Sequence, residues 1–394
     1  MILLDKPYVS DFLIKTIKEH NLEVIATPVA KELVQNTNLN WISEKEAIHK
    51  YKENPNIPIY TNSENTINWI ENNLDFSELP NHIQYFKDKI LFRELIQDAF
   101  PNYYFQGVKY ADLDNLNLDD VVFPFIIKPA IGFFSLGVHK VDEPNEWPEV
   151  LAKIQSEISA IQGFYPVEVL DADYFIIEEC IKGEEYAVDC YFDANGKPVI
   201  LNISHHVFSS GKDVSDRVYS TSQEVIEKIH PIALNFLEFL SSKLALKNFP
   251  IHIEVRIDDK GFLNPIEVNP IRFGGWCTTS DLSWFAYGIN SYVSFLKGLK
   301  PNWDAIFKTR EDKKYSIIIL DNNSGIPENQ IAYFDYDLLL SEFENPLVLR
   351  KVDFKEYPIF GILFTETSKG NEVELEQILS ANMNKYINQK SVID

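Results

Sequence analysis

Cysteine is scarce in this sequence. The three cysteines, Cys180, Cys190 and Cys277, form no C-x-x-C pair and no zinc-ligand spacing. This pattern is typical of a reducing compartment, where thiols serve as small buried side chains. No stretch approaches the roughly 20 apolar residues of a membrane-spanning helix, and Asp5 interrupts the N-terminal apolar run where a signal peptide would continue. We therefore expect a cytoplasmic protein with no membrane partner.

Basic residues are also few. The chain has 36 Lys and Arg against 59 Asp and Glu, which gives a formal net charge of -23. Sequence-independent binding to nucleic acid or to anionic membranes needs basic surface, so neither is expected as a partner. An acidic protein that binds an anionic ligand has to concentrate its cations locally. Individual lysines and arginines are therefore informative here.

Residues 1–83 alternate short apolar strands with amphipathic helices, which predicts a small parallel α/β domain. The first strand, "MILL", is not followed by G-x-G-x-x-G, so we expect no dinucleotide site there. The chain of 394 residues, 45% of them hydrophobic, is long enough for two or three domains with sizeable cores.

The rest of the chain is expected to mix strands and helices. A helix is predicted over residues 84–100, with Asp88 as its cap. A long helix is predicted over 221–246, opened by Thr221 in a capping-box pattern. The last segment, 301–394, is rich in strands and ends in a helix, which predicts a third, smaller unit.

The stretch "HIEVRIDDKGFLNPIEVNP", residues 252–270, is typical of a β-hairpin. A two-residue loop at Lys260-Gly261 would place Asp259 opposite Phe262. Counting back along both strands then puts Glu254 directly opposite Glu267. Like charges facing each other across an antiparallel pair are destabilising, so this arrangement needs a reason.

A divalent cation would supply that reason. Glu254, Glu267 and Asn269 share one face of the predicted hairpin, and Mg²⁺ prefers one or two carboxylates together with waters and substrate phosphates. The alternative is a solvated sheet face on which Arg256 neutralises the acids. Taken alone, the hairpin leaves both interpretations open.

Two lysines are candidates for binding phosphate. Lys128 ends a predicted strand and precedes a loop with Gly132 and Gly137, whose free backbone amides suit phosphate oxygens. Lys89 lies in the first turn of a predicted helix, where a cation opposes the helix dipole unless an anion is bound. The alternatives are an ordinary turn beside a solvent-exposed lysine and a surface lysine.

Further candidates have weaker individual signals. Glu178 ends one predicted strand and Glu185 lies in the next, so the two acids could meet adenine and ribose. Arg217 lies in a long polar segment, 204–222, that could bring a cation over a phosphate. Acids at strand ends and polar surface loops are also common without any such role.

Taken in order, these residues resemble the ATP-grasp superfamily of ATP-dependent ligases. The resemblance runs over residues 84–300 and is carried by Lys89, Lys128 with its glycine loop, "EECIKGEE", and the 13-residue spacing of the hairpin acids. One departure is Ile271, which stands between "EVNP" and Arg272, where many members have the arginine directly. The family roles that the resemblance implies are phosphate binding by Lys89 and Lys128, adenine contacts by Glu178 and the backbone of Glu179, Cys180 and Ile181, ribose binding by Glu185, and metal binding by Glu254, Glu267 and Asn269.

The resemblance implies a multidomain α/β and α+β fold. Residues 1–83 look like the family's Rossmann-like pre-ATP-grasp domain, and residues 84–300 would be the ATP-grasp fold, in which two α+β subdomains sandwich ATP. The small, lid-forming subdomain is placed at about 105–178 and the metal-binding subdomain at about 179–300. Residues 301–394 would form the C-terminal α+β unit.

The function implied is an ATP-dependent carboxylate–amine ligase that works through an acyl phosphate. Its cofactors would be ATP and two Mg²⁺, which Mn²⁺ could replace. Its substrates would be an amino acid or small peptide, and a homodimer would be compatible with the resemblance. Lys128, Arg217 and Arg272 are the expected catalytic residues, with Arg272 on the substrate carboxylate or on the acyl-phosphate oxygens. The alternatives are a catalytically silent ATP-binding scaffold and an ATP-grasp enzyme with kinase-like or thioester-forming chemistry.

Overall fold

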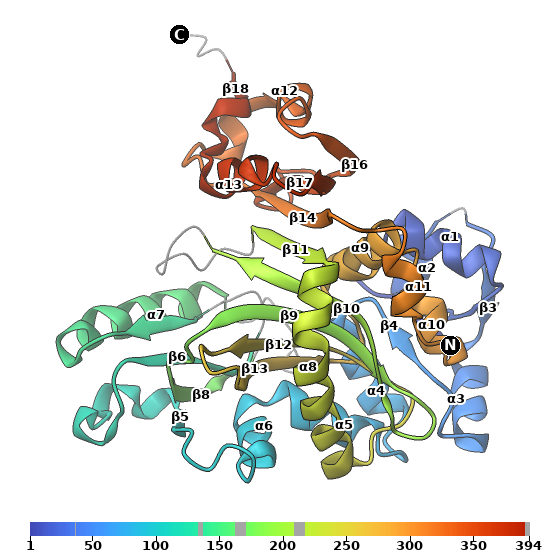
Figure 1. Ribbon diagram of the computed structural model, residues 1–394. Helices are drawn as coiled ribbons and strands as arrows, with labels where there is room; N and C mark the ends of the chain where they lie inside the picture. Colours follow the sequence, from blue (N-terminus) through green and yellow to red (C-terminus); the bar gives the residue numbers. More distant parts are fainter. Residues whose placement is uncertain (36, 133–136, 162–170, 209–216, 391–394) are drawn as a thin grey trace.

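The computed structural model describes residues 1–35, 37–132, 137–161, 171–208 and 217–390 (Figure 1). Its N-terminal unit is a four-stranded parallel sheet in the order β3-β2-β1-β4, which confirms the predicted parallel α/β domain. The sequence did not predict β3. The elements of this unit are β1 (Ile2–Leu3), α1 (Asp11–Glu19), β2 (Glu23–Ile25), α2 (Pro28–Leu33), β3 (Asn40–Ile42), α3 (Glu44–Glu53), β4 (Tyr60–Thr61), η1 (Glu64–Thr66) and α4 (Ile67–Asn73).

Two short helices follow, α5 (Leu79–Lys87) and α6 (Lys89–Ile96). The predicted single helix over 84–100 is therefore wrong in its extent, but Asp88 is the cap as predicted. Its side chain accepts hydrogen bonds from the backbone N–H groups of Ile90 and Leu91. Because Asp88 is extended and capped in this way, α6 begins at Lys89.

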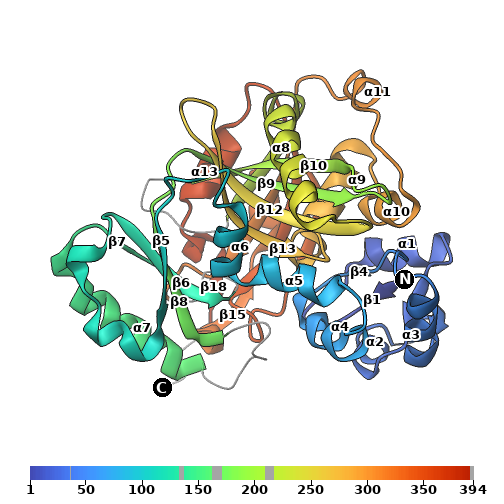
Figure 2. The same cartoon turned by 90° about the horizontal axis from the view of Figure 1, so that it is seen from below.

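A small antiparallel sheet comes next, in the order β5-β8-β6-β7, and α7 packs against it. It has a hydrophobic core of its own, built around Phe125, Ile127 and Phe175. Figure 2 shows this sheet and the N-terminal unit at opposite ends of the molecule, with α5 and α6 between them. The elements are β5 (Phe105–Lys109), β6 (Phe125–Ile131), β7 (His139–Val141), α7 (Trp147–Ile161) and β8 (Asp171–Glu179).

The centre of the molecule is an eight-stranded antiparallel sheet in the order β13-β12-β9-β10-β11-β14-β17-β16. The predicted helix cap at Thr221 is wrong by one residue, because the Ser222 side chain accepts from the Val225 N–H. Pro231 lies inside the uninterrupted α8. The elements up to residue 307 are β9 (Glu184–Phe192), β10 (Pro198–Val207), β11 (Val218–Ser222), α8 (Gln223–Leu244), β12 (Phe249–Ile257), β13 (Leu263–Pro270), α9 (Thr278–Tyr287), α10 (Ser291–Lys297) and α11 (Trp303–Phe307).

The C-terminal segment continues this same sheet. Three of its strands, β14, β17 and β16, follow β11, and a separate hydrophobic core forms around Phe334 and Phe360. The exact domain boundaries stay a prediction. The remaining elements are β14 (Lys313–Asp321), β15 (Ile331–Phe334), α12 (Tyr336–Leu340), β16 (Asn345–Lys351), β17 (Ile359–Ser368), α13 (Val373–Ser380) and β18 (Ile387–Gln389).

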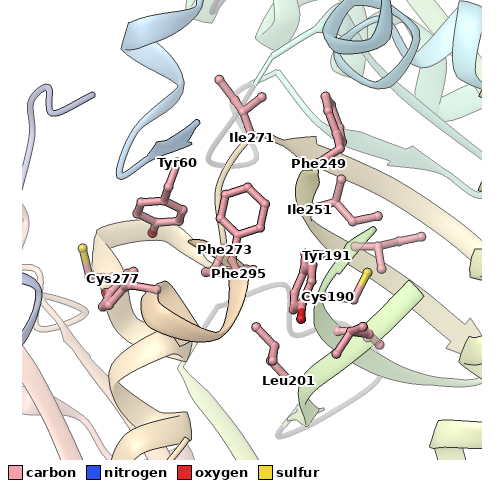
Figure 3. Packing of buried hydrophobic residues seen from close by; sticks show 14 of the residues in the cluster. Tyr60, Cys190, Tyr191, Leu201, Phe249, Ile251, Ile271, Phe273, Cys277 and Phe295 are labelled. Atoms are coloured by element: carbon pink, nitrogen blue, oxygen red, sulfur yellow. The ribbon is translucent and has the colours of Figure 1, made fainter. Parts of the chain in front are cut away.

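One hydrophobic core joins the N-terminal unit to the large sheet. In Figure 3, Tyr60 of β4 lies beside Phe273, which follows β13, and their ring centroids are 5.4 Å apart. Ile271 and Ile251 belong to the same buried cluster. None of the helices in the described ranges is long and apolar enough to span a membrane.

Candidate active site

The hairpin of β12 and β13 brings the predicted acids together. Glu254 pairs directly with Glu267, and His252 pairs with Asn269 on the same face. The pairing expected from the sequence is confirmed. Two carboxylates and an amide therefore lie on one face at the edge of the large sheet.

The turn of this hairpin differs from the prediction. The Asp258 N–H donates to the Phe262 carbonyl, so the loop contains three residues, and Asp259 does not face Phe262. Gly261 supplies the left-handed φ, +82°, that such a loop requires. A bulge next to Glu254 absorbs the extra residue and restores the register of the two acids.

Glu267 is held by cations. Its Oε2 lies 3.3 Å from Lys89 Nζ, and its Oε1 accepts a hydrogen bond of 3.3 Å from Asn269 Nδ2. Burial acts to raise its pKa, but the positive charges of Lys89, Lys128 and Lys87 outweigh burial and lower the pKa of Glu267 to about 2. This carboxylate is ionised throughout the physiological range.

Glu254 has a different environment. Partial burial, strengthened by repulsion from Glu267, raises its pKa. Within the described part of the chain its ion-pair partner is His252, whose Nε2 lies 3.7 Å from Glu254 Oε1. The His252 ring also makes a 2.7 Å contact with Asp189 through Nδ1. Burial lowers the pKa of His252, but these two acids outweigh burial and raise it to about 9.

Lys128 and Arg93 both bind Glu178. Lys128 Nζ lies 2.6 Å from Glu178 Oε1, and Arg93 Nε donates to Oε2 over 2.7 Å. All three side chains are buried. Burial alone would raise the pKa of Glu178, but the two cations lower it to about 2.

Arg93 also connects this cluster to the metal hairpin. Its Nη1 and Nη2 donate to the backbone carbonyls of Pro265 and Ile266, over 2.7 and 3.1 Å. Arg93 lies one helical turn after Lys89 in α6, so the two cations share a helix face. The sequence prediction missed Arg93, although this i, i+4 spacing is visible in the sequence.

The link between β8 and β9 keeps two backbone groups free. Among the described residues, the Cys180 carbonyl and the Ile181 N–H have no hydrogen-bond partner. The Ile181 carbonyl accepts from Arg256 Nη1 over 2.6 Å. The Glu179 N–H and carbonyl are used by Tyr104 and Tyr103. An acceptor and a donor on adjacent residues match the edge of a nucleotide base.

Glu185 lies on β9 next to this link. It contacts His206 Nδ1 at 2.8 Å and Arg256 Nη2 at 2.9 Å. Burial works against ionisation, but these partners lower the pKa of Glu185.

Arg272 is held by the N-terminal unit. Its Nη2 lies 2.9 Å from Glu64 Oε1, and the other oxygen of Glu64 is bonded to Lys87. The extra residue before it, Ile271, has a left-handed φ of +59°, and its carbonyl accepts from the Thr61 N–H. A β-branched residue rarely takes this conformation. Glu64 and Lys87 were not predicted as site residues.

Arg217 does not join this cluster. Its guanidinium pairs with both oxygens of Asp321, over 2.8 and 2.9 Å, and its Nη1 donates to the carbonyl of Ala381 over 2.8 Å. These partners belong to the C-terminal segment. The expected contact of Arg217 with a phosphate therefore has no support in the observed geometry.

The glycine loop is described at its two ends. The Gly132 carbonyl accepts from Lys89 Nζ over 3.4 Å, and Gly137 has a φ of +69°. Residues 133–136 lie outside the described part. Trp276, near Arg272 in the sequence, stacks on Tyr8 with ring centroids 5.7 Å apart.

Comparison with known proteins decides the family of this site. The model of the ATP-grasp domain matches residues 121–280. The chain contains an ATP-grasp domain. Residues 121–280 include Lys128, the 179–181 link and the hairpin acids.

Solved structures with an ATP-grasp fold match over nearly the whole chain. The L-amino acid ligase of Bacillus licheniformis is 17% identical, with a TM-score of 0.68 and coverage of 99% of this chain and 98% of that one. The biotin carboxylase of Campylobacter jejuni is 13% identical, with a TM-score of 0.63 and coverage of 99% of this chain and 92% of that one. The N5-carboxyaminoimidazole ribonucleotide synthetase of Thermotoga maritima is also 13% identical, with a TM-score of 0.63 and coverage of 99% of both chains. At such identities the likeness shows the fold alone. No curated protein matches the sequence.

The donor set of this ATP-grasp domain suits Mg²⁺ with a nucleotide. In the described ranges no group of three or more His, Cys, Asp or Glu side chains forms a metal cage. Glu254, Glu267 and Asn269 supply two carboxylates and one amide, which leaves most of an octahedral shell to waters and phosphates. Lys89 and Lys128, which pair with Glu267 and Glu178, are the lysines of this cluster that could neutralise phosphate charge. ATP-grasp proteins bind MgATP, and these residues fit that ligand.

Proposed function

We propose that this protein is an ATP-dependent carboxylate–amine ligase acting on an amino acid or small peptide. The observation that carries the proposal is the Glu254–Glu267 pair, which faces Lys89 at one end of a cluster that also holds Lys128. A pair of repelling acids is retained at a cost in stability. A bound divalent cation converts that cost into coordination.

The nucleotide would lie between the small sheet and the large sheet. The free Cys180 carbonyl and Ile181 N–H would meet the base, and Glu185 would accept from the ribose hydroxyls. Lys89 and Lys128 would pair with phosphate oxygens. With a nucleotide bound, Lys128 would interact with a phosphate oxygen as well as with Glu178. Glu178 would still be paired with Arg93.

Glu254, Glu267 and Asn269 would hold one or two Mg²⁺, and the bound metal would supply charge neutralisation for the transferred phosphoryl group. Phosphoryl transfer depends mainly on positioning and charge neutralisation. The γ-phosphoryl group passes to an oxygen of the substrate carboxylate, and ADP leaves. The amine then attacks the acyl carbon, loses a proton, and phosphate departs with the C–O bonding electrons.

Arg272 would bind the substrate carboxylate and the oxygens of the acyl phosphate. Its planar guanidinium suits either group. The three-member cluster of Arg272, Lys87 and Glu64 carries one net positive charge, which suits an anionic substrate. Arg217 has no role in this proposal, because Asp321 occupies its guanidinium.

The test is to incubate the purified protein with ATP, Mg²⁺ and pools of amino acids and carboxylates. Phosphate release is measured for each pool, and products are identified by mass spectrometry. We expect substrate-dependent phosphate together with a new amide. Hydroxylamine should trap the acyl phosphate as a hydroxamate.

Other outcomes separate the alternatives. Nucleotide binding without phosphate release from any pool would favour a silent ATP-binding protein. Nucleotide consumption with a phosphorylated or thioester product, and no amide, would favour a different ATP-grasp chemistry. The L-amino acid ligase likeness supports amino acids as the first pool to test.

A further inference from the structure

Asp189 is a buried acid that lies outside the residues assigned above. It lies on β9, directly opposite His252 of β12, and only 1% of its surface is exposed. Its Oδ1 lies 2.7 Å from His252 Nδ1 and also accepts from the Gly274 N–H over 3.2 Å. The second oxygen, Oδ2, is buried without a hydrogen-bond partner in the described part of the chain.

This arrangement is unfavourable as a purely structural feature. A buried carboxylate oxygen with no partner costs free energy, because it has left water without gaining a hydrogen bond. Among the described residues, Asp189 forms an ion pair with His252 and with no lysine or arginine. His252 is therefore the one charged group that holds it.

The histidine lies between two acids. Its Nδ1 contacts Asp189, and its Nε2 lies 3.7 Å from Glu254 Oε1. His252 and Glu254 are two residues apart on one strand, so both side chains point to the same face. Rotation of the ring is restricted on the Asp189 side, and this fixes where Nε2 points.

We propose that Asp189 is a positioning residue that acts through His252 on the metal ligand Glu254. It holds the imidazole so that Nε2 faces Glu254, and the imidazole in turn limits the orientations of that carboxylate. Outer-shell partners of this kind typically change metal affinity by about 10–100-fold when they are removed. This inference rests on the proposed nucleotide and metal site. It extends that site by Asp189 and His252, which are proposed to contact neither ligand.

The test measures Mn²⁺ binding in the presence of ADP by electron paramagnetic resonance, which reports free Mn²⁺ and needs no substrate. The variants are Asp189→Asn, His252→Asn and the double variant. Asparagine keeps an oxygen that can accept from the Gly274 N–H. We expect each single variant to weaken Mn²⁺ binding about tenfold. The double variant should bind like His252→Asn alone, because Asp189 acts through the ring.

Asp193→Asn is the matched control. Asp193 directly follows the same strand, is buried, and pairs with Lys300 at 3.0 Å, but it contacts no residue of the candidate site. It should leave Mn²⁺ affinity unchanged. Thermal unfolding of every variant separates loss of fold from loss of metal, and His252→Asn carries the test if Asp189→Asn does not fold.

Two results would overturn the inference. One is unchanged Mn²⁺ affinity in a folded Asp189→Asn variant, with lowered thermal stability alone. The other is a double variant in which the two losses add, which would mean that Asp189 does not act through His252. A wild-type protein that binds no Mn²⁺ with ADP would instead contradict the proposed function itself.

Discussion

Glu178 and Glu254 are two acids of the same site with opposite surroundings. Glu178 is buried between Lys128 and Arg93 at 2.6 and 2.7 Å, and its pKa falls to about 2. Glu254 faces a second acid, has His252 at 3.7 Å, and its pKa is raised. The difference shows where the site lacks positive charge. A divalent cation would stabilise the hairpin end far more than the Glu178 end.

The largest effect should follow from removing a hairpin acid. Glu267→Gln keeps the shape of the side chain but removes a carboxylate that would contact metal, so substrate-dependent phosphate release should fall by at least about a hundredfold. Circular dichroism should show an intact fold. Near-wild-type turnover in this variant would mean that the metal assignment is wrong.

Removing a cation from Glu178 should lower the stability of the fold. Arg93→Met leaves Glu178 with one cation and removes donors to the carbonyls of Pro265 and Ile266. Removing one partner of a buried ion pair typically costs about 3–5 kcal/mol. Urea unfolding should therefore show a clearly lowered midpoint. The matched variant Arg256→Met removes a half-exposed arginine from Glu185 and should cost less.

The two acids should also have opposite pH signatures. A carboxyl whose folded pKa is about 2, against 4.5 unfolded, stabilises the protein above pH 4.5 and loses that contribution as pH falls toward 2. For Glu178 this amounts to about 3 kcal/mol. The raised pKa of Glu254 has the reverse sign, since its ionisation destabilises the fold as pH rises through that pKa.

Thermal unfolding between pH 3 and 8 without metal checks this contrast. Glu254→Gln should raise the melting temperature near neutral pH, and Glu178→Gln should lower it. Addition of MgADP should narrow the gap between wild type and Glu254→Gln, because the metal compensates the acid. A lower melting temperature for both variants would contradict the comparison.

The smallest effect should come from removing the N-cap of α6, the helix that carries both Lys89 and Arg93. Asp88 caps α6, which carries Lys89 toward Glu267 and Arg93 toward Glu178. Asp88→Ala should cost about 1 kcal/mol, measured by urea unfolding. Asp88→Ser can still accept from the backbone, so it should recover most of the loss. Equal losses in the two variants would argue against capping as the cause.

Much of the hairpin could be predicted because its pattern is local. Counting back from the expected turn gave the Glu254–Glu267 pairing, and the alternation of apolar and polar residues along the strands supported that register. The turn length was wrong, since "DDKG" is compatible with loops of two or three residues. The bulge that compensated for it leaves no clear sign in the sequence.

The contacts that were not predicted from the sequence join residues far apart along the chain. Arg93 meets Glu178 across 85 positions, and Arg272 meets Glu64 across 208. On an amphipathic helix an isolated arginine resembles a surface residue until its partner is known. Arg217 was predicted to contact a phosphate because its partner Asp321, 104 residues away, could not be recognised from the sequence.

The contact between Thr61 and Ile271 has a consequence for motion. The Thr61 N–H donates to the Ile271 carbonyl over 3.0 Å, so edge strand β4 is joined to the chain that leaves β13. The N-terminal unit and the large sheet also share one hydrophobic core, whereas the small sheet has its own. The first two should therefore move as a single rigid body.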